Sequence, residues 1–165
     1  MPSPILSYPR REGEFFLSTD ASDDGLGAVL EQDQVNKDGK VERKVVAYAS
    51  KILSRTQRRY CTTNKELLAV ITSCEQFRYY LLGPKFTVIT DHSSLRWLQR
   101  FKEPEGMVAR WISRLAPFEF DVVHRLGIQH GHADGLSRRV LRACKRLDCK
   151  ECMPIRTEES KRQLQ

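Results

Sequence analysis

Short runs of apolar residues, separated by polar and turn-forming residues, dominate the first third of the chain. The runs over residues 14–20, 25–32 and 44–50 have the length and the bounding residues that are typical of β-strands. The sequence Asp23-Asp24-Gly25 is a turn signal, and it predicts that the first two runs form a hairpin. Because the connections between the three runs are short, we expect three antiparallel strands.

The next segment carries the clearest helical pattern of the sequence. Its apolar residues recur at spacings of 4, 3, 3 and 4, which places them on one face of a helix over about 64–82. Gly83-Pro84 is expected to end this helix. The residues of the apolar face are Leu67, Ile71, Cys74, Phe77 and Leu81.

The rest of the pattern alternates between strand and helix. The apolar run 86–90 predicts a buried strand, and the alternation of apolar and acidic residues over 118–122 predicts a half-buried fifth strand. Helices are expected over 92–100 and 106–116, and a last helix should begin near Asp134. A strand–helix–strand unit within one sheet requires a right-handed parallel crossover. The sequence therefore predicts an α/β fold with a five-stranded mixed sheet, three antiparallel strands first and parallel additions later, flanked by helices.

The length of 165 residues indicates one domain with one sizeable core. We place a lead-in at residues 1–13, the domain at 14–139, and a basic, cysteine-containing tail or linker at 140–165. No stretch approaches the roughly 18 uninterrupted apolar residues of a membrane span. The N-terminus also lacks the apolar segment of a secretory signal, so we expect an intracellular protein without a membrane partner.

The net charge of the chain is +7, and its pI is about 9.3. An excess of cations fits a polyanionic partner such as nucleic acid, because each phosphate that is neutralised releases counterions. Charge alone leaves the question open, since many basic domains bind nothing specific.

The five cysteines are odd in number, which argues against a disulfide framework. Cys74 falls on the apolar helical face and is expected in the core. Cys144, Cys149 and Cys152 in the tail could offer three thiolates to zinc, but a structural zinc site needs four ligands. The tail alone does not complete such a site.

Four acidic residues occupy positions from which they could converge. Asp20 ends the first strand, Glu66 lies in the first turn of the long helix, Asp91 ends the fourth strand, and Asp134 opens the last helix. The ends of neighbouring strands lie about 5–10 Å apart, and a helix packed over that edge can add a carboxylate. Such a cluster could hold two divalent cations about 4 Å apart, as in-line phosphoryl displacement needs.

Each of the four acids also has a purely structural interpretation. Thr63 and Glu66 match the spacing of a capping box. Asp91 and Asp134 could each cap the helix that follows, and Asp20 could be a turn residue. Spacing alone does not decide between these interpretations and a metal site.

Taken in order, several blocks of the sequence resemble the RNase H domain of gypsy-type LTR retrotransposon Pol polyproteins. The resemblance covers residues 4–139, and the segment 4–9 resembles the join from the polymerase connection region. The matching blocks are Thr19–Ser22 with Gly25–Leu30, Tyr48–Lys51, Thr62–Val70, Phe77–Gly83, Phe86–His92, Arg110-Trp111 and Ala133–Arg138.

This resemblance implies an RNase H-like fold and a metal-dependent endonuclease that hydrolyses the RNA strand of RNA–DNA hybrids during reverse transcription. It implies that Asp20, Glu66, Asp91 and Asp134 are the catalytic metal ligands, holding two Mg²⁺ ions, with Mn²⁺ as a substitute. The implied partners are an RNA–DNA hybrid and the reverse transcriptase and integrase parts of the polyprotein. The implied location is the cytoplasm or a retroelement particle, or else the nucleus. The alternative is a catalytically silent, domesticated fragment that binds nucleic acid or protein.

Basic and histidine residues near these acids complete the candidate site. Taken singly, each basic residue is more simply explained as a solvated surface charge and each histidine as a solvent-exposed loop residue, whereas the basic residues as a group fit phosphate contacts better. His130 and His132 could shuttle a proton near neutral pH, as a loop histidine does in related RNases H. The candidates for contacts with the nucleic acid are Arg55, Arg58, Arg59, Lys65, Arg96 and Arg100.

Overall fold

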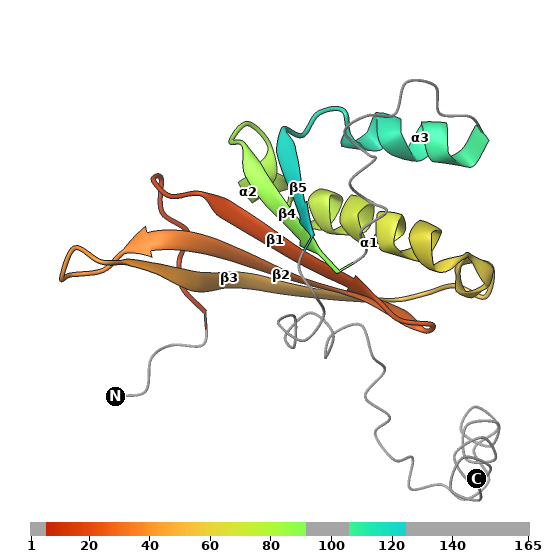
Figure 1. The fold of residues 1–165 in the computed structure, drawn as a ribbon, viewed down its shortest axis with the longest axis horizontal. Coiled ribbons are helices and arrows are strands. Elements are labelled where there is room, and N and C mark those ends of the chain that lie inside the picture. Colours follow the sequence, from red (N-terminus) through yellow and green to blue (C-terminus); the bar gives the residue numbers. More distant parts are fainter. Residues whose placement is uncertain (1–5, 92–105, 125–165) are drawn as a thin grey trace, which may run out of the picture.

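A computed structural model describes residues 6–91 and 106–124, which form a five-stranded sheet with helices on one side (Figure 1). The strand order is β3-β2-β1-β4-β5. β1 pairs antiparallel with β2, β2 pairs antiparallel with β3, and β4 and β5 are added in parallel to β1. The predicted mixed α/β sheet is confirmed.

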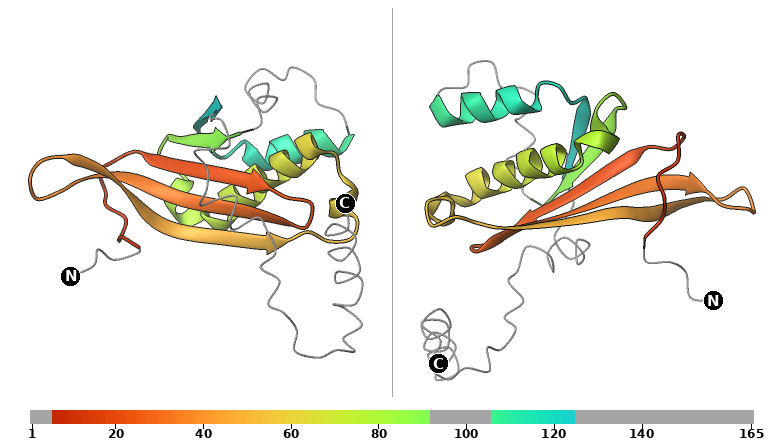
Figure 2. Two further views of the ribbon diagram at one scale, coloured as in Figure 1. Left: turned by 60° about the horizontal axis from the view of Figure 1, so that its bottom comes forward. Right: turned by 180° about the vertical axis from the view of Figure 1, so that it is seen from behind.

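The strands begin close to where the apolar runs predict, but two of them are longer. The hairpin of β2 and β3 keeps its pairing as far as Val35 and Val41, beyond the predicted ends, and extends past β1 (Figure 2). Most residues of this extension are polar, among them the ion pair of Asp33 with Arg43, and Val35 and Val41 at its end are exposed. Apolar periodicity therefore does not predict the extension. The observed strands are β1 (Phe15–Ala21), β2 (Gly25–Val35), β3 (Val41–Ile52), β4 (Phe86–Thr90) and β5 (Phe120–His124).

β5 begins two residues later than predicted. Phe118 is buried, but it packs into the core from a turn in which its amide donates to the carbonyl of Leu115. The ladder starts only at Phe120, which pairs with Phe86 of β4. Phe118 continues the alternating apolar pattern of β5 although it precedes the strand, and for this reason the predicted strand began two residues too early.

The long predicted helix is two helices. After the short 3₁₀ helix η1 (Gln57–Arg59), α1 (Thr62–Gln76) and α2 (Arg78–Leu81) are separated at Phe77, where φ is −97° and ψ is 20°. Phe77 and Leu81 are nevertheless both buried in the same core, so the apolar spacing continues through the break. α3 (Gly106–Leu115) matches its prediction to within a residue, whereas the predicted helix 92–100 and the last helix lie outside the described residues.

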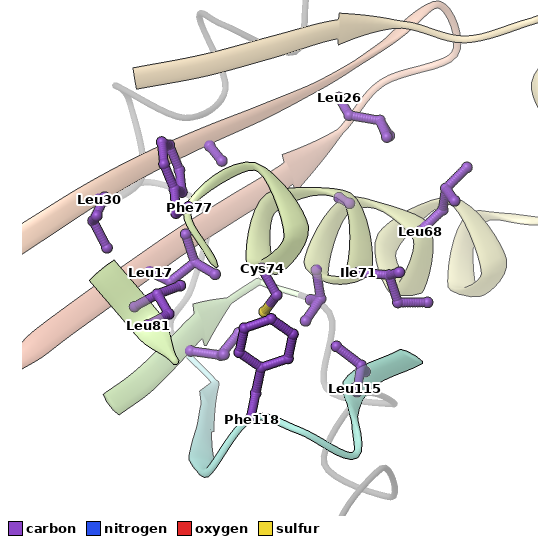
Figure 3. Close-up of a cluster of buried hydrophobic side chains, with 14 of the residues drawn as sticks. Leu17, Leu26, Leu30, Leu68, Ile71, Cys74, Phe77, Leu81, Leu115 and Phe118 are labelled. Atoms are coloured by element: carbon purple, nitrogen blue, oxygen red, sulfur yellow. The ribbon is translucent and has the colours of Figure 1, made fainter. Parts of the chain in front are cut away.

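The core lies between the helices and one face of the sheet. Figure 3 shows Leu17 from the sheet beside Leu81 of α2, and Cys74 of α1 above the ring of Phe118. Cys74 is fully buried, as its place on the apolar face predicted, and burial raises the pKa of its thiol to about 12. In the part of the chain that is described, no helix is long and apolar enough to cross a membrane.

Within residues 6–91 and 106–124, Phe86 is the largest fully buried side chain, and its truncation should be costly. Its ring contacts the rings of Phe118 and Phe120, with centroids 6.5 and 5.6 Å away. We expect Phe86→Ala to lower the free energy of unfolding in urea by about 4 kcal/mol, because it leaves a cavity between β4 and the helices. Tyr79→Ala, at a fully exposed side chain, is the control and should change it little.

The segment before β1 is held along the end of β2. The side chain of Gln32 is fully buried; its Oε1 accepts from the amide of Arg10 at 2.8 Å, and its Nε2 donates to the carbonyl of Arg10 at 2.9 Å. Gln34 Nε2 donates to the carbonyl of Tyr8 at 2.9 Å, and the amide of Ser7 donates to the carbonyl of Val45. Among the described residues, contacts with the sheet therefore extend back to Ser7, within the predicted lead-in 1–13.

Candidate active site

Asp20 and Asp91 meet because β1 and β4 are adjacent and parallel. The two strands pair from Phe15↔Phe86 to Ser18↔Ile89, so their carboxyl ends lie at the same edge of the sheet. Asp20 is the penultimate residue of β1, and Asp91 directly follows β4. Asp20 pairs with Gly27 inside the β1–β2 ladder, which rules out the interpretation of Asp20 as a turn residue.

Glu66 joins these two acids from α1. Helix α1 begins after Cys61, which makes no side-chain capping bond, so Thr63 is not the cap and the capping-box interpretation of Glu66 is wrong. The helix begins about two residues earlier than predicted, so Glu66 lies beyond the first turn, and its Oε1 accepts from the amide of Ala21 in β1 at 3.3 Å. One carboxylate oxygen from each of Asp20, Glu66 and Asp91 lies within 4.8 Å of the other two. We call these three residues the acid cluster.

The acid cluster is electrostatically unfavourable on its own. Burial, followed by the charges of Asp20 and Asp91, raises the pKa of Glu66 to about 8, and only the amide of Ala21 opposes this rise. Glu66 is 3% exposed, and its Oε2 is buried without a hydrogen-bond partner among the described groups. A divalent cation bound between the three carboxylates would offset their repulsion and give the buried Oε2 of Glu66 a partner. Because all the donors are oxygen atoms, the site suits Mg²⁺ or Mn²⁺.

Several predicted site residues lie outside the described residues. They include the fourth acid, the helix that Asp91 could cap, both candidate proton shuttles and two of the basic residues. The residues concerned are Asp134, His130, His132, Arg96 and Arg100, together with Cys144, Cys149 and Cys152 of the tail.

The remaining basic candidates divide into two groups. Arg55, Arg58 and Arg59 are exposed in the segment that leads into α1, and Arg58 lies 3.4 Å from Asp24. Lys65 is different, because it is only 7% exposed and its Nζ lies 2.7 Å from Oδ1 of Asp23. The ammonium holds the pKa of the Asp23 carboxyl below its usual range through this bond. In this conformation the ammonium of Lys65 is bound by Asp23, and its predicted contact with nucleic acid stays a prediction.

Two contacts at the acid cluster were not predicted from the sequence. Nε2 of His124 lies 2.9 Å from the carbonyl oxygen of Asp91, so the last residue of β5 holds the backbone that carries the Asp91 carboxylate. The predicted fifth strand ended at 122, which left His124 in a loop. The other contact is the Ala21 amide, a backbone donor that no residue type signals.

The sequence of the chain is similar to those of known proteins. The family described as the RNase H-like domain found in reverse transcriptase matches residues 10–118. The retrovirus-related Pol polyprotein from transposon 297 of Drosophila melanogaster is 38% identical over 135 residues, which cover 82% of this chain and 12% of that protein. The Pol polyprotein from transposon gypsy of the same organism is 29% identical over 157 residues, covering 94% and 14%. The chain thus spans about an eighth of the length of these curated relatives.

Solved structures show the same fold at low sequence identity. LC11-RNase H1 in complex with an RNA/DNA hybrid matches with a TM-score of 0.55 and 15% identity, covering 74% of this chain and 93% of that chain. The foamy viral protease-reverse transcriptase in complex with dsDNA matches with a TM-score of 0.53 and 21% identity, covering 73% and 25%. These matches confirm the RNase H-like fold. By sequence and by fold, the chain belongs to the family of RNase H-like domains found in reverse transcriptases, in the form carried by retrotransposon Pol polyproteins.

Proposed function

We propose that this chain is a metal-dependent endonuclease that hydrolyses the RNA strand of RNA–DNA hybrids. The observation that carries the proposal is the meeting of Asp20, Glu66 and Asp91 at one edge of the sheet. The residues come from β1, α1 and the end of β4, and nothing in the packing of the core requires three acids there. An energetically costly cluster of this kind is expected where a site is kept for chemistry.

In this proposal the acid cluster holds two Mg²⁺ ions, which Mn²⁺ could replace, with Asp134 as the fourth ligand. When bound, such a pair of ions supplies a nucleophilic hydroxide and stabilises the leaving 3′ oxygen. The protein residues orient the ligands: the Ala21 amide holds Glu66, and His124 holds the backbone at Asp91. His130 and His132 remain candidates for moving a proton near neutral pH.

The family and the charge of the chain support an RNA–DNA hybrid as the proposed substrate. RNases H select hybrids by their wide minor groove, where 2′-hydroxyls are exposed, and by phosphate contacts on both strands. Arg55, Arg58 and Arg59 are exposed in the segment before α1 and are proposed to contact phosphates. Arg96 and Arg100, which follow Asp91 in the sequence, are proposed for the same role. The net charge of +7 supports a polyanionic substrate.

The natural partners proposed are the reverse transcriptase and integrase parts of a Pol polyprotein. The curated relatives are Pol polyproteins about eight times as long as the matched segment, which supports this context. In such a polyprotein the nuclease would remove the RNA strand behind the polymerase, within the cytoplasm or a retroelement particle.

The test is cleavage of an end-labelled RNA–DNA hybrid by the purified 165-residue chain. We expect RNA cleavage with Mg²⁺ that leaves 5′-phosphate and 3′-hydroxyl ends, none with EDTA, and recovery when Mg²⁺ is added in excess. RNA–RNA and DNA–DNA duplexes of the same sequence are the controls and should stay intact. Binding of the hybrid without cleavage would instead support the silent binding module, and cleavage that persists in EDTA would contradict the metal site.

A further inference from the structure

The turn between β1 and β2 is tied to α1 by an ion pair next to the acid cluster. Asp23 lies in this turn, and its side chain is fully exposed except for its contact with Lys65. The Nζ of Lys65 donates to Oδ1 of Asp23 at 2.7 Å, across 42 positions of sequence. The pair therefore links the end of the first strand to the first turns of the helix.

The burial of Lys65 gives this pair more weight than an exposed ion pair would have. The side chain of Lys65 is only 9% exposed, and a buried ammonium is costly unless it is paired and hydrogen-bonded. Within the described ranges, Asp23 is the acid that forms an ion pair with it. Loss of the Asp23 charge would leave this ammonium to move outward or to stay unpaired.

A second contact between the end of β1 and α1 is the hydrogen bond from the amide of Ala21 to the carboxylate of Glu66. Glu66 follows Lys65 directly, and the Ala21 amide that donates to Glu66 lies two residues before Asp23. That amide bond is long, at 3.3 Å, and the charges of Asp20 and Asp91 repel the carboxylate that it holds. A shorter, charged contact beside it keeps the strand end and the helix together.

We propose that Asp23 and Lys65 form a latch that positions Glu66 against the end of β1 and thereby sets the affinity of the acid cluster for divalent cations. The latch rests on the proposed function for its effect on cleavage, but not for its effect on the geometry at Ala21. Neither residue touches the reacting atoms, so both are positioning residues.

A second ion pair in the same turn provides a matched control. Asp24 lies 3.4 Å from Arg58, and its carbonyl accepts from the amide of Leu53. These contacts tie the turn to the segment before α1 and not to the helix that carries Glu66. Asp24→Asn therefore removes the same charge from the same turn and leaves the latch intact.

The experiment measures the Mg²⁺ concentration for half-maximal cleavage of the hybrid by the full chain. We expect Asp23→Asn and Lys65→Met to raise it about fivefold, the effect of losing one partly buried ion pair, with the KM for the hybrid unchanged. Asp23→Glu keeps the charge and should restore most of the wild-type value. Asp24→Asn should leave it unchanged.

Hydrogen exchange of the Ala21 amide, followed by NMR without metal, tests the latch independently of cleavage. We expect faster exchange in Asp23→Asn but not in Asp24→Asn, while the amide of Leu17 in the core exchanges as in the wild type in both. Unchanged exchange at Ala21 in Asp23→Asn, or equal changes in both variants, would overturn the latch. If the wild-type chain does not cleave, the proposed function fails, and the exchange data still decide the latch.

Discussion

Replacing Asp20 by asparagine should abolish cleavage of the RNA–DNA hybrid while leaving the fold intact. Asp20 lies at the centre of the acid cluster, 9% exposed, with an oxygen within 4.8 Å of oxygens from Glu66 and Asp91. Asparagine keeps the shape and removes the charge that would hold a divalent cation. We expect the cleavage rate with Mg²⁺ to fall by at least about a hundredfold. The folded state should be slightly favoured without metal, because one repulsion on Glu66 is gone.

The matched control is Asp121→Asn. Asp121 is also a strand aspartate, but it is half exposed and paired with Lys85 at 2.8 Å, away from the carboxyl ends of β1 and β4. This variant should cleave at the wild-type rate. Circular dichroism of both variants should match the wild type. Full activity of a folded Asp20→Asn protein would refute the assignment of the acid cluster as the metal site.

The second large effect is a pH-dependent loss of stability in the metal-free chain, which comes from Glu66. Its pKa is about 8 in the folded chain, compared with 4.5 for an ordinary glutamate. Because the folded pKa is raised, folding favours the protonated acid. The stabilisation is complete below about pH 4.5, is lost as the pH rises from there through about 8, and does not change further at higher pH. A rise of this size corresponds to a loss of about 5 kcal/mol.

Glu66→Gln should remove most of this dependence. The glutamine carbonyl can still accept from the amide of Ala21, and it carries no charge for Asp20 and Asp91 to repel. In EDTA at pH 9 we expect a higher melting temperature for Glu66→Gln than for the wild type, with near equality at pH 4.5. Excess Mg²⁺ at pH 9 should stabilise the wild type and not the variant, and the variant should not cleave the hybrid. Equal slopes of stability against pH for the two proteins in EDTA would show that Glu66 does not titrate as described.

The fold could be predicted from the sequence wherever the buried residues repeat with the period of a strand or of a helix. The strands around Leu17 and Val88 and the helix through Ile71 carry apolar patterns that the core imposes directly. The extended ends of β2 and β3 were not predictable in this way, because pairs such as Asp33 with Arg43 satisfy a ladder without burying apolar surface. The break between α1 and α2 at Phe77 was not predicted because buried apolar residues continue at helical spacing on both sides of it.

The candidate site was predictable in its residue types and less so in its contacts. Strand order brings Asp20 and Asp91 to one edge, and a resemblance to a family indicated Glu66, although spacing alone also suited a cap. The environment of Lys65 could not be foreseen, because its partner Asp23 looks like an ordinary turn residue. The contact of His124 with the Asp91 carbonyl depends on exactly where β5 ends, and that is the least predictable property of a strand.

The clamp that Gln32 makes on the segment before β1 has a mechanical consequence for any domain that precedes this one. The backbone from Ser7 to Gly13 is held to β2 and β3 by hydrogen bonds. A flexible linker from such a domain would therefore have to end at or before Ser7. This anchorage sits beside the start of β1, roughly 17 Å of strand away from Asp20. A domain that precedes this chain would therefore be attached at the end of the sheet opposite to the acid cluster.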